Sequence, residues 1–534
     1  MRKQYTLDRG WSFYEEQVNK DPQKLCDVEL IDLPHTWNKN GNVDRGRYVY
    51  VKDLDVDPTH KQDKLYLEFL GANTVCQVYL DDQFIGEHRG GYSTFRFELT
   101  KFYSWDGKNQ LKVYVDNSQT EDVSPLLGDF TIYGGLYRSV NLICVNESHF
   151  DLMFHGSSGV ILRPELDNEG RGILDIESHI VANKDLKINY TLCDSDGRIV
   201  ADECKDLRLN DKAILKSSIT IDNCRMWKGK EDPYLYDFEA KLIMDDRIVD
   251  QIKIKTGFRK CSLDSDKGFF LNNKALKING VAKHQDFEGV GNAITTDHLR
   301  KDFDLIDDIG ANSVRLSHYQ HNQETYDICD GEGYVVWAEI PMMSMPDSIN
   351  LMDNAKEQLK ELVYQNVHHP SICFWGIQNE IAMGGESLQM YKGVNDLNDL
   401  FHQILPKGIS ASANMNFVKN DSTLNFITDL LGYNHYFGWY YGKEEELNDW
   451  LDCFHKENPQ VKLGISEYGA DCNLKFHSDQ PKVKDYSEEF QAVYHEKTYK
   501  IIESKPYLWG SYVWNMFDFG SSVRNEGGTV GKNA

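Results

Sequence analysis

Two glutamates in the second half of the chain each follow a short apolar run directly. Glu380 comes after the segment SICFWGIQN, and Glu467 comes after KLGIS. A charged side chain at the end of a buried run is costly unless partners solvate it or the protein uses it. Two facing carboxylates can hydrolyse a glycosidic bond, one as nucleophile and one as general acid and then base, if they lie roughly 5 to 5.5 Å apart. The alternative that spacing leaves open is a pair of unrelated rim acids, each bound to an arginine.

The segments that must position these glutamates alternate short apolar runs with amphipathic helical stretches from residue 259 onward. DHLRKDFDLIDDIG and NAKEQLKELVYQNV are two of the helical stretches. This alternation predicts parallel βα units, and eight of them predict a (β/α)8 TIM barrel. The eight candidate strands are residues 275–284, 312–318, 334–341, 371–380, 408–414, 429–436, 462–469 and 508–519.

Polar residues finish nearly all of these predicted strands. Active sites of TIM barrels lie at the C-terminal ends of the strands, so these residues are expected to meet at one mouth. Strands four and seven lie on opposite sides of the barrel, which lets Glu380 and Glu467 face each other. The strand-end residues are Lys283, His284, Gln285 and Asp286, then Arg315 and His318, Glu339, Asn379 and Glu380, Asn434 and Tyr436, Glu467 and Tyr468, and finally Trp514, Asn515 and Asp518.

The chain before residue 259 has the alternating texture of β-structure. Short runs of period two, broken by turns, predict an all-β, jelly-roll-like sandwich over residues 1–148. About seven shorter strands over residues 149–258 are typical of an immunoglobulin-like β-sandwich. We therefore expect a multidomain chain whose third domain, residues 259–534, is the catalytic TIM barrel.

Composition narrows the class of partner. With 58 Lys+Arg against 84 Asp+Glu, the net charge of −26 disfavours nucleic acid and membrane surfaces. The 11 cysteines, scattered from Cys26 to Cys472, never fall as CxxC, which favours reduced thiols over disulfides or zinc. The first residues, MRKQYTLDRGWSFYEE, contain no apolar h-region and the sequence has no apolar run of 18 residues, so we expect neither export nor a membrane anchor. We expect a cytoplasmic protein whose partner is a small or neutral molecule, and the 29 Tyr, 25 Phe and 10 Trp suit either a β-rich core or sugar rings.

Several long segments resemble glycoside hydrolase family 2, and the resemblance covers nearly the whole chain. In the barrel they are GANSVRLSHYQHNQETYDICDGEGYVVWAEIP (310–341), HHPSICFWGIQNE (368–380), GISEYGAD (464–471) and WGSYVWNMFDFGS (509–521). LPHTWN (33–38) and DFTIYGGLYRSV (129–140) look like the family's N-terminal sugar-binding-type domain. The resemblance implies a retaining exo-β-glycosidase that releases terminal β-linked sugars through a glycosyl-enzyme intermediate.

The resemblance also implies roles for individual residues. Glu380 matches the acid/base and Glu467 the nucleophile, and Arg315 matches the arginine that keeps the nucleophile ionised. The pKa of the acid/base should be raised by burial and by its acidic neighbour, and should fall once the nucleophile is glycosylated. The residues that match substrate-binding positions are Asp129, His284, His318, Asn379, Tyr436 and Trp514.

Two departures from the family pattern affect the expected cofactor and the residues that surround the catalytic side chains. Where the large β-galactosidases have a glutamate and a histidine beside their magnesium, this chain has Met343 and Met345. Thioethers are poor ligands for a hard cation, so we expect no magnesium beside Glu380 and no other cofactor. The first strand ends in Lys-His-Gln-Asp in place of the commoner Arg-His-Glu.

Three functions stay open at this point, with β-galactosidase first because WNMFDFGS followed by RNEGG resembles that branch of the family. The alternative is β-glucuronidase, since NHYFGWY resembles the tyrosine-rich segment of that branch. Glucuronate needs a cation, which that branch supplies from an Asn-x-Lys after strand eight, and here Asn533-Ala534 ends the sequence. The third is a non-catalytic carbohydrate-binding protein. We expect a barrel that ends before its closing helix. Assembly into a homo-oligomer is left open by the sequence.

Overall fold

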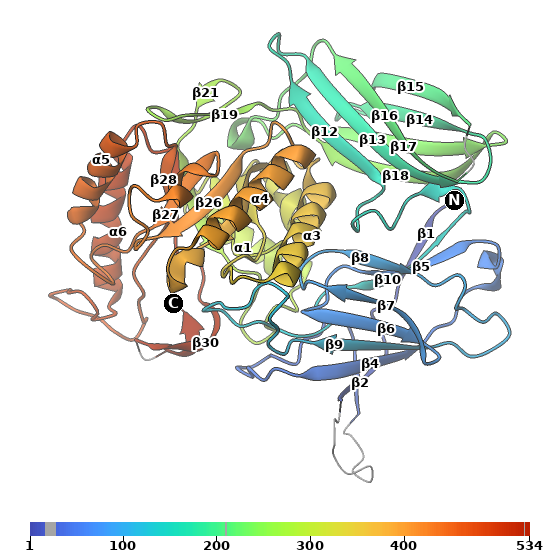
Figure 1. Ribbon diagram of the computed structural model, residues 1–534, viewed down its shortest axis with the longest axis horizontal. Coiled ribbons are helices and arrows are strands. Elements are labelled where there is room, and N and C mark those ends of the chain that lie inside the picture. Colours follow the sequence, from blue (N-terminus) through green and yellow to red (C-terminus); the bar gives the residue numbers. More distant parts are fainter. Residues whose placement is uncertain (17–27, 209–210, 528, 534) are drawn as a thin grey trace.

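The computed structural model describes residues 1–16, 28–208, 211–527 and 529–533. Cys26 and Ala534 lie outside these described residues. Figure 1 shows two β-sandwiches, blue and green, against one side of an α/β barrel that runs from yellow to red. In the part of the chain that is described, no helix is long and apolar enough to cross a membrane.

The N-terminal unit is a sandwich of two antiparallel sheets. Its strands bury alternate residues, as in β9 (Gln110–Asp116), because successive side chains of a strand point to opposite faces. One sheet is ordered β1 (Lys3–Thr6), β10 (Val140–Val145), β5 (Lys64–Phe69) and β8 (Phe95–Glu98). The other is ordered β3 (Glu29–Ile31), β2 (Trp11–Glu15), β4 (Arg47–Asp53), β9, β6 (Val75–Leu80) and β7 (Gln83–Arg89). A 3-10 helix, η1, covers Pro58–His60.

The second unit is an immunoglobulin-like sandwich, and its core is built from alternating apolar residues of both sheets. The first sheet contains β11 (His149–Phe150), β13 (Gly172–Ala182) and β12 (Val160–Leu166), with β16 (Asp211–Ile221) also paired to β13. The second is ordered β15 (Ile199–Leu207), β14 (Leu186–Cys193), β17 (Tyr236–Met244) and β18 (Arg247–Thr256). The 3-10 helix η2 (Gly229–Glu231) lies between β16 and β17.

The third unit is a closed barrel of eight parallel strands that pair in chain order, which confirms the predicted TIM barrel. The strands are β22 (Ile278–Lys283), β23 (Ser313–Leu316), β24 (Val335–Glu339), β25 (Ile372–Asn379), β26 (Ser410–Met415), β27 (Leu430–Asn434), β28 (Leu463–Tyr468) and β29 (Gly510–Val513). Each overlaps one of the predicted segments.

Within the described residues six α-helices surround the barrel, and serine side chains cap three of them. Ser348, Ser387 and Ser487 accept backbone N–H groups at the starts of α3, α4 and α6, which stabilises those helix termini. The helices are α1 (Thr296–Asp308), α2 (Gln323–Glu332), α3 (Ile349–Asn366), α4 (Leu388–Ile404), α5 (Glu446–Glu457) and α6 (Glu488–Glu503). The 3-10 helix η4 (Thr423–Phe426) replaces an α-helix between β26 and β27, and η3 (Ile381–Gly384) follows β25.

A small sheet closes the barrel at the N-terminal ends of its strands. It consists of β19 (Cys261–Asp264), β20 (Gly268–Leu271) and β21 (Lys274–Ala275). Phe269 packs edge-on against Phe374 of β25, within a cluster that also contains Trp337 and Trp509. We call this sheet and its apolar cluster the barrel floor.

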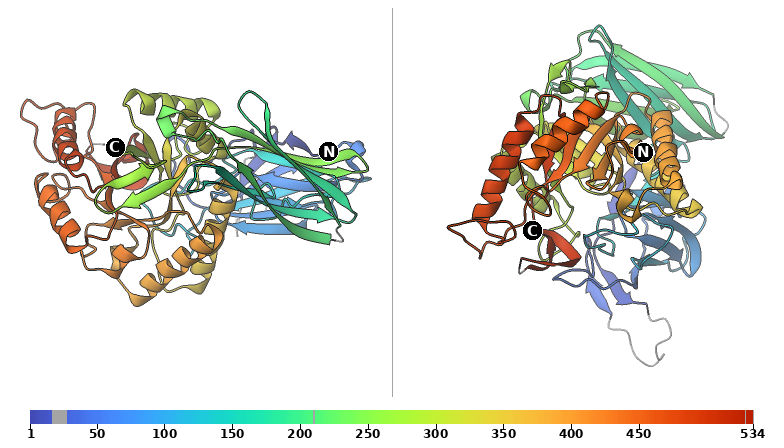
Figure 2. Two further views of the ribbon diagram at one scale, coloured as in Figure 1. Left: turned by 90° about the horizontal axis from the view of Figure 1, so that it is seen from above. Right: turned by 60° about the vertical axis from the view of Figure 1, so that its left-hand side comes forward.

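At the opposite end of the strands, the N-terminal sandwich reaches the mouth of the barrel. Arg138 Nη2 donates to Gln285 Oε1 at 2.8 Å and to the Gln320 carbonyl at 3.1 Å, and all three residues are buried. After β29 the chain forms a hairpin of β30 (Phe519–Glu526) and β31 (Thr529–Asn533) beside this sandwich (Figures 1 and 2). The backbone N–H of Thr131 donates to the Gly520 carbonyl at 2.7 Å, which joins the sandwich to the hairpin.

Candidate active site

A cavity of about 490 Å³ opens at the C-terminal ends of the barrel strands. It brings together both predicted catalytic glutamates and five of the predicted substrate-binding residues. Of the other two predicted residues, Arg315 lies beneath the cavity and His284 lies behind it. The lining residues are Asp129, His318, Met343, Asn379, Glu380, Asn416, Phe417, Asn434, Tyr436, Tyr440, Tyr441, Glu467, Trp514 and Arg524.

Glu467 is held at both of its carboxylate oxygens. Arg315 Nη1 donates to Oε1 at 2.7 Å, and the Tyr436 hydroxyl donates to Oε2 at 2.7 Å. The glutamate lies near the end of β28, and the tyrosine follows the end of β27. Two fixed donors leave the carboxylate one orientation, so its reactive oxygen keeps a constant position toward the cavity.

Arg315 is fully buried and serves several acceptors at once. Besides Glu467 it donates to Glu339 Oε1 at 3.2 Å and to Asn379 Oδ1 at 2.7 Å. Because the Asn379 oxygen faces Arg315, the nitrogen of that amide is left to donate toward a ligand in the cavity. Asn434 Nδ2 also donates to this oxygen, at 3.3 Å, and Ser466 Oγ holds the Asn434 oxygen at 2.7 Å.

The ionisation of Glu467 depends on burial as well as on Arg315, which lowers the pKa in the expected direction. Burial is the largest influence and raises the pKa of Glu467 to about 7, although Arg315 and the Tyr436 hydrogen bond both lower it. Arg315 therefore limits the rise in pKa that burial causes, and does not hold the pKa at an ordinary carboxylate value. The sequence located the arginine and gave no measure of burial.

Glu380 lies directly after β25 in a backbone conformation that is unusual for a residue with a side chain. Its φ of 51° is in the left-handed region, and its N–H donates to the Ala413 carbonyl at 2.9 Å. Such a conformation costs about 1–3 kcal/mol and is found where surrounding structure enforces it, often at functional sites. Burial, followed by the charge of Glu467, raises the pKa of Glu380 to about 8.

His318 and Trp514 form an aromatic wall of the cavity. The two rings stack with centroids 5.0 Å apart and 23° between their planes. His318 Nδ1 lies 2.8 Å from Glu339 Oε1, and burial followed by the Arg315 charge holds the pKa of His318 well below its usual value. The ring is therefore neutral with its hydrogen on Nδ1, which makes Nε2 an acceptor for a hydroxyl.

His284 is placed less directly than the sequence suggests. Its ring lies 5.5 Å from Trp514 and 5.3 Å from His318, centroid to centroid, and its Nδ1 is 3.1 Å from the Tyr319 hydroxyl. His284 is not one of the residues that line the cavity. Contact with substrate stays a prediction for this histidine, and the geometry supports a role in packing the aromatic wall.

Arg524 is a functional candidate that the sequence reasoning missed. It comes from β30, lines the cavity, and donates to Asp129 Oδ2 at 2.6 Å. Its guanidinium carbon also lies 6.0 Å from the centre of the Tyr440 ring. Asp129 belongs to the N-terminal sandwich, so this ion pair joins two domains at the mouth. No spacing signal marks Arg524, because it lies beyond the last barrel strand.

Of the two methionines at the positions of the magnesium ligands, one lines the cavity and the other lies in the barrel core. Met343 lines the cavity, whereas Met345 is 8% exposed and belongs to the main barrel core. Among the described residues, no group of three or more His, Cys, Asp or Glu side chains is arranged to hold a metal. We assign no metal-dependent step to this site.

Comparison with known proteins agrees with this arrangement of domains. The family descriptions "Glycosyl hydrolases family 2, sugar binding domain", "Glycosyl hydrolases family 2" and "Glycosyl hydrolases family 2, TIM barrel domain" match residues 26–145, 158–259 and 264–529. The chain is 36% identical to a β-glucuronidase of Bacteroides fragilis, a match that covers 100% of this chain and 78% of the relative. It is 28% identical to a β-galactosidase of Thermoanaerobacter pseudethanolicus, covering 96% of this chain and 66% of that one.

A solved structure gives the same result in three dimensions. The crystal structure titled "FMN-binding beta-glucuronidase from Facaelibacterium prausnitzii L2-6" matches with a TM-score of 0.93 and 38% identity, covering 100% of this chain and 82% of that one. The fold and the site thus define a glycoside hydrolase that acts on small carbohydrate substrates. The chain belongs to glycoside hydrolase family 2.

Proposed function

We propose that this protein is a retaining exo-β-glucuronidase. The similarity that supports this specificity is the 36% identity, over the whole chain, to a protein named β-glucuronidase. The solved structure at 38% identity also carries that name, whereas the β-galactosidase relative is 28% identical. This reverses the order of the sequence-based hypotheses, which placed the galactoside first.

Arg524 gives the proposal a physical basis. A glucuronide differs from a galactoside in bearing a carboxylate, and binding an anion inside a half-buried cavity requires a cation. The Arg524 guanidinium lines the cavity, where it pairs with Asp129 and contacts the Tyr440 hydroxyl, so the site holds a cation at the place where a substrate carboxylate would need one. Asn533, which matches the first residue of the Asn-x-Lys motif, lies in β31.

In the first step, the Glu467 carboxylate attacks the anomeric carbon while Glu380 gives its proton to the departing oxygen. The glycosidic bond breaks and a covalent glycosyl ester forms on Glu467. The raised pKa of Glu380 keeps it protonated before this step, because burial and the Glu467 charge both disfavour a second anion. The Asn379 amide nitrogen is placed to donate to the sugar 2-hydroxyl, a contact that strengthens in the transition state.

In the second step, water replaces the enzyme at the anomeric carbon. Once Glu467 is esterified it carries no charge, so the pKa of Glu380 falls and its carboxylate can take a proton from water. The water oxygen attacks the anomeric carbon as its proton passes to Glu380, the bond to Glu467 breaks and releases the carboxylate, and the sugar leaves with its β configuration retained. Arg315 and Tyr436 stabilise the released carboxylate.

The specificity is tested by assaying nitrophenyl β-D-glucuronide, β-D-galactoside and β-D-mannoside side by side. We expect the highest kcat/KM on the glucuronide. A preference for the galactoside would restore the first sequence-based hypothesis. If none of the three is hydrolysed and a sugar still binds, the non-catalytic alternative is correct.

Replacing Arg524 by glutamine should reduce kcat/KM for the glucuronide selectively. Loss of a charge-assisted contact of roughly 1.5–3 kcal/mol corresponds to a fall of about 10- to 100-fold. The galactoside, which has no carboxylate, should lose much less, and Arg524→Lys should restore part of the loss. Arg300→Gln, which removes an exposed arginine on α1, is the matched control. An equal loss on both substrates would show that Arg524 serves only its ion pair with Asp129.

A further inference from the structure

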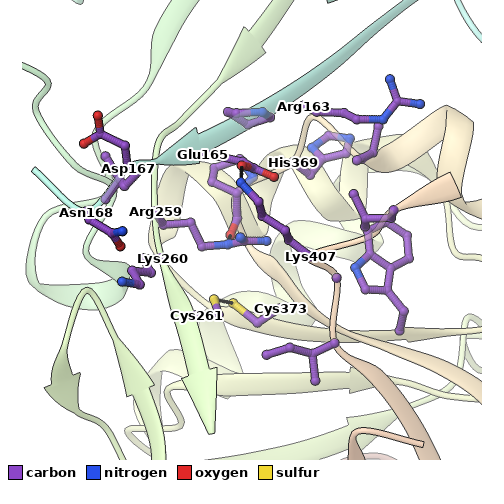
Figure 3. Close-up of a pocket in the computed structure, with 18 residues that line it drawn as sticks. Arg163, Glu165, Asp167, Asn168, Arg259, Lys260, Cys261, His369, Cys373 and Lys407 are labelled. Atoms are coloured by element: carbon purple, nitrogen blue, oxygen red, sulfur yellow. Dashed lines mark hydrogen bonds and ion pairs between the residues drawn. The ribbon is translucent and has the colours of Figure 1, made fainter. Parts of the chain in front are cut away.

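A pair of cysteines lies at the barrel floor, far along the sequence from one another. Cys261 begins β19, Cys373 is the second residue of β25, and their sulfur atoms are 3.3 Å apart (Figure 3). Neither residue belongs to the candidate active site, which lies at the other end of β25. The other cysteines of the described chain are free thiols, of which Cys224 contacts the Arg225 carbonyl and the Tyr236 hydroxyl and Cys453 contacts a Glu457 oxygen.

Both sulfur-bearing side chains line a cavity of about 440 Å³ between the immunoglobulin-like sandwich and the barrel floor. Cys261 is partly exposed, whereas Cys373 is 2% exposed. A small molecule that enters this cavity therefore meets Cys261 first. Figure 3 shows the pair with Lys260 and Arg259 close by and the ion pair of Lys407 with Glu165 on the opposite wall.

Arg259 gives the two sulfurs different chemistry. Its guanidinium donates to the carbonyls of Pro370 and Ile372, which fixes the positive charge beside the start of β25. Burial raises the pKa of the Cys261 thiol, but its hydrogen bond with Cys373 and the Arg259 charge together outweigh burial and lower the pKa. Burial, together with Cys261, raises the pKa of Cys373 well above its usual value. Cys261 therefore loses its proton more readily than Cys373.

We propose that Cys261 and Cys373 form a reversible dithiol–disulfide site that is oxidised by small-molecule disulfides such as oxidised glutathione. The Cys261 thiolate attacks one sulfur of the disulfide, its S–S bond breaks, and one thiolate leaves. Cys373 then gives its proton to that thiolate, attacks the Cys261 sulfur of the mixed disulfide, and releases the second thiolate, which takes up from solvent the proton that Cys261 had lost. Two electrons pass from the protein to the small disulfide, which becomes two thiols, and a thiol in excess reverses both steps.

The geometry favours closure over a lasting mixed disulfide. A disulfide bond is about 2.05 Å long, so the sulfurs must approach by about 1.3 Å from their present positions. The bond would join residues 112 positions apart and tie the barrel floor to the strand that ends at Asn379. Closing so long a loop restricts the unfolded chain, so the oxidised protein should resist heat better than the reduced one.

The test uses the full chain, equilibrated with oxidised and reduced glutathione at a series of ratios and then mapped by mass spectrometry without reduction. We expect one cross-linked peptide pair containing Cys261 and Cys373, in an amount that rises with the oxidised fraction and disappears on return to excess reduced glutathione. The thermal unfolding midpoint should be higher by about 5 °C in the oxidised form.

Variants separate the two sulfurs. Cys373→Ser should stop at a stable glutathione adduct on Cys261, and Cys261→Ser should leave Cys373 unmodified because it is buried. Cys453→Ser, which changes an exposed cysteine on α5, should leave the cross-link intact. The proposal is overturned if Cys453 or Cys204 reacts while Cys261 and Cys373 both stay free, or if wild-type Cys261 carries glutathione with Cys373 still a thiol. Both readouts are independent of which glycoside the enzyme hydrolyses.

Discussion

Glu467→Gln lowers kcat on every nitrophenyl β-glycoside that the wild type cleaves, on the order of 10⁴-fold or more. An amide is a poor nucleophile, so the covalent ester cannot form, and the group that replaces the carboxylate carries no charge to stabilise the oxocarbenium-like transition state. Glutamine has nearly the same size as glutamate and can still contact Arg315 and Tyr436. The loss is therefore expected in kcat, with the fold preserved.

Two comparisons make this result specific. Glu357→Gln changes a glutamate on α3 that pairs with His155 outside the cavity, and it should keep wild-type activity. An activated 2-deoxy-2-fluoro-β-glucuronide, which forms the ester quickly and releases it slowly, should label Glu467 in the wild type and no residue in Glu467→Gln. Full activity in the variant, or a label on another carboxylate, would show that Glu467 is not the nucleophile.

The barrel could be predicted from the sequence because its signals are local. Each strand is a short apolar run, and a helical stretch follows most of these runs. In a parallel barrel the C-terminal ends of the strands must then meet at one mouth. Glu380 and Glu467 were found because a charge at the end of a buried run is costly. That rule needs only the order of residues along the chain and no knowledge of long-range contacts.

The features that could not be predicted depend on contacts between distant segments. Asp129 was expected at the site from the family resemblance, but its ion pair with Arg524 was not, because Arg524 comes from a hairpin beyond the last barrel strand and no spacing connects the two residues. Cys261 and Cys373 likewise meet only because the barrel floor folds under β25. The rise in the pKa of Glu467 could not be predicted for the same reason. It depends on how deeply the folded chain buries the carboxylate, which the order of residues does not show.

The pH dependence of the wild-type enzyme follows from the opposite states that the two glutamates need. Glu467 must be ionised, so activity falls as pH drops below its pKa of about 7. Glu380 must be protonated, so activity falls as pH rises above its pKa of about 8. The two groups interact, so kcat/KM should be a narrow bell whose limbs belong to the pair.

Glu380→Gln should remove the alkaline limb of the pH profile. Its effect on the rate should also depend on how much protonation the leaving group of the substrate needs. For phenyl or methyl glucuronides, whose departing oxygen needs a proton, kcat/KM should fall by about 10²- to 10⁴-fold. For a nitrophenyl glucuronide the first step needs little proton donation, so the glycosyl ester should accumulate and appear as a burst of nitrophenol. Azide attacks that ester without a general base, and it should therefore restore turnover and yield the β-glycosyl azide. If the variant keeps its alkaline limb and azide has no effect, another group must supply the proton and Glu380 is a structural rim acid.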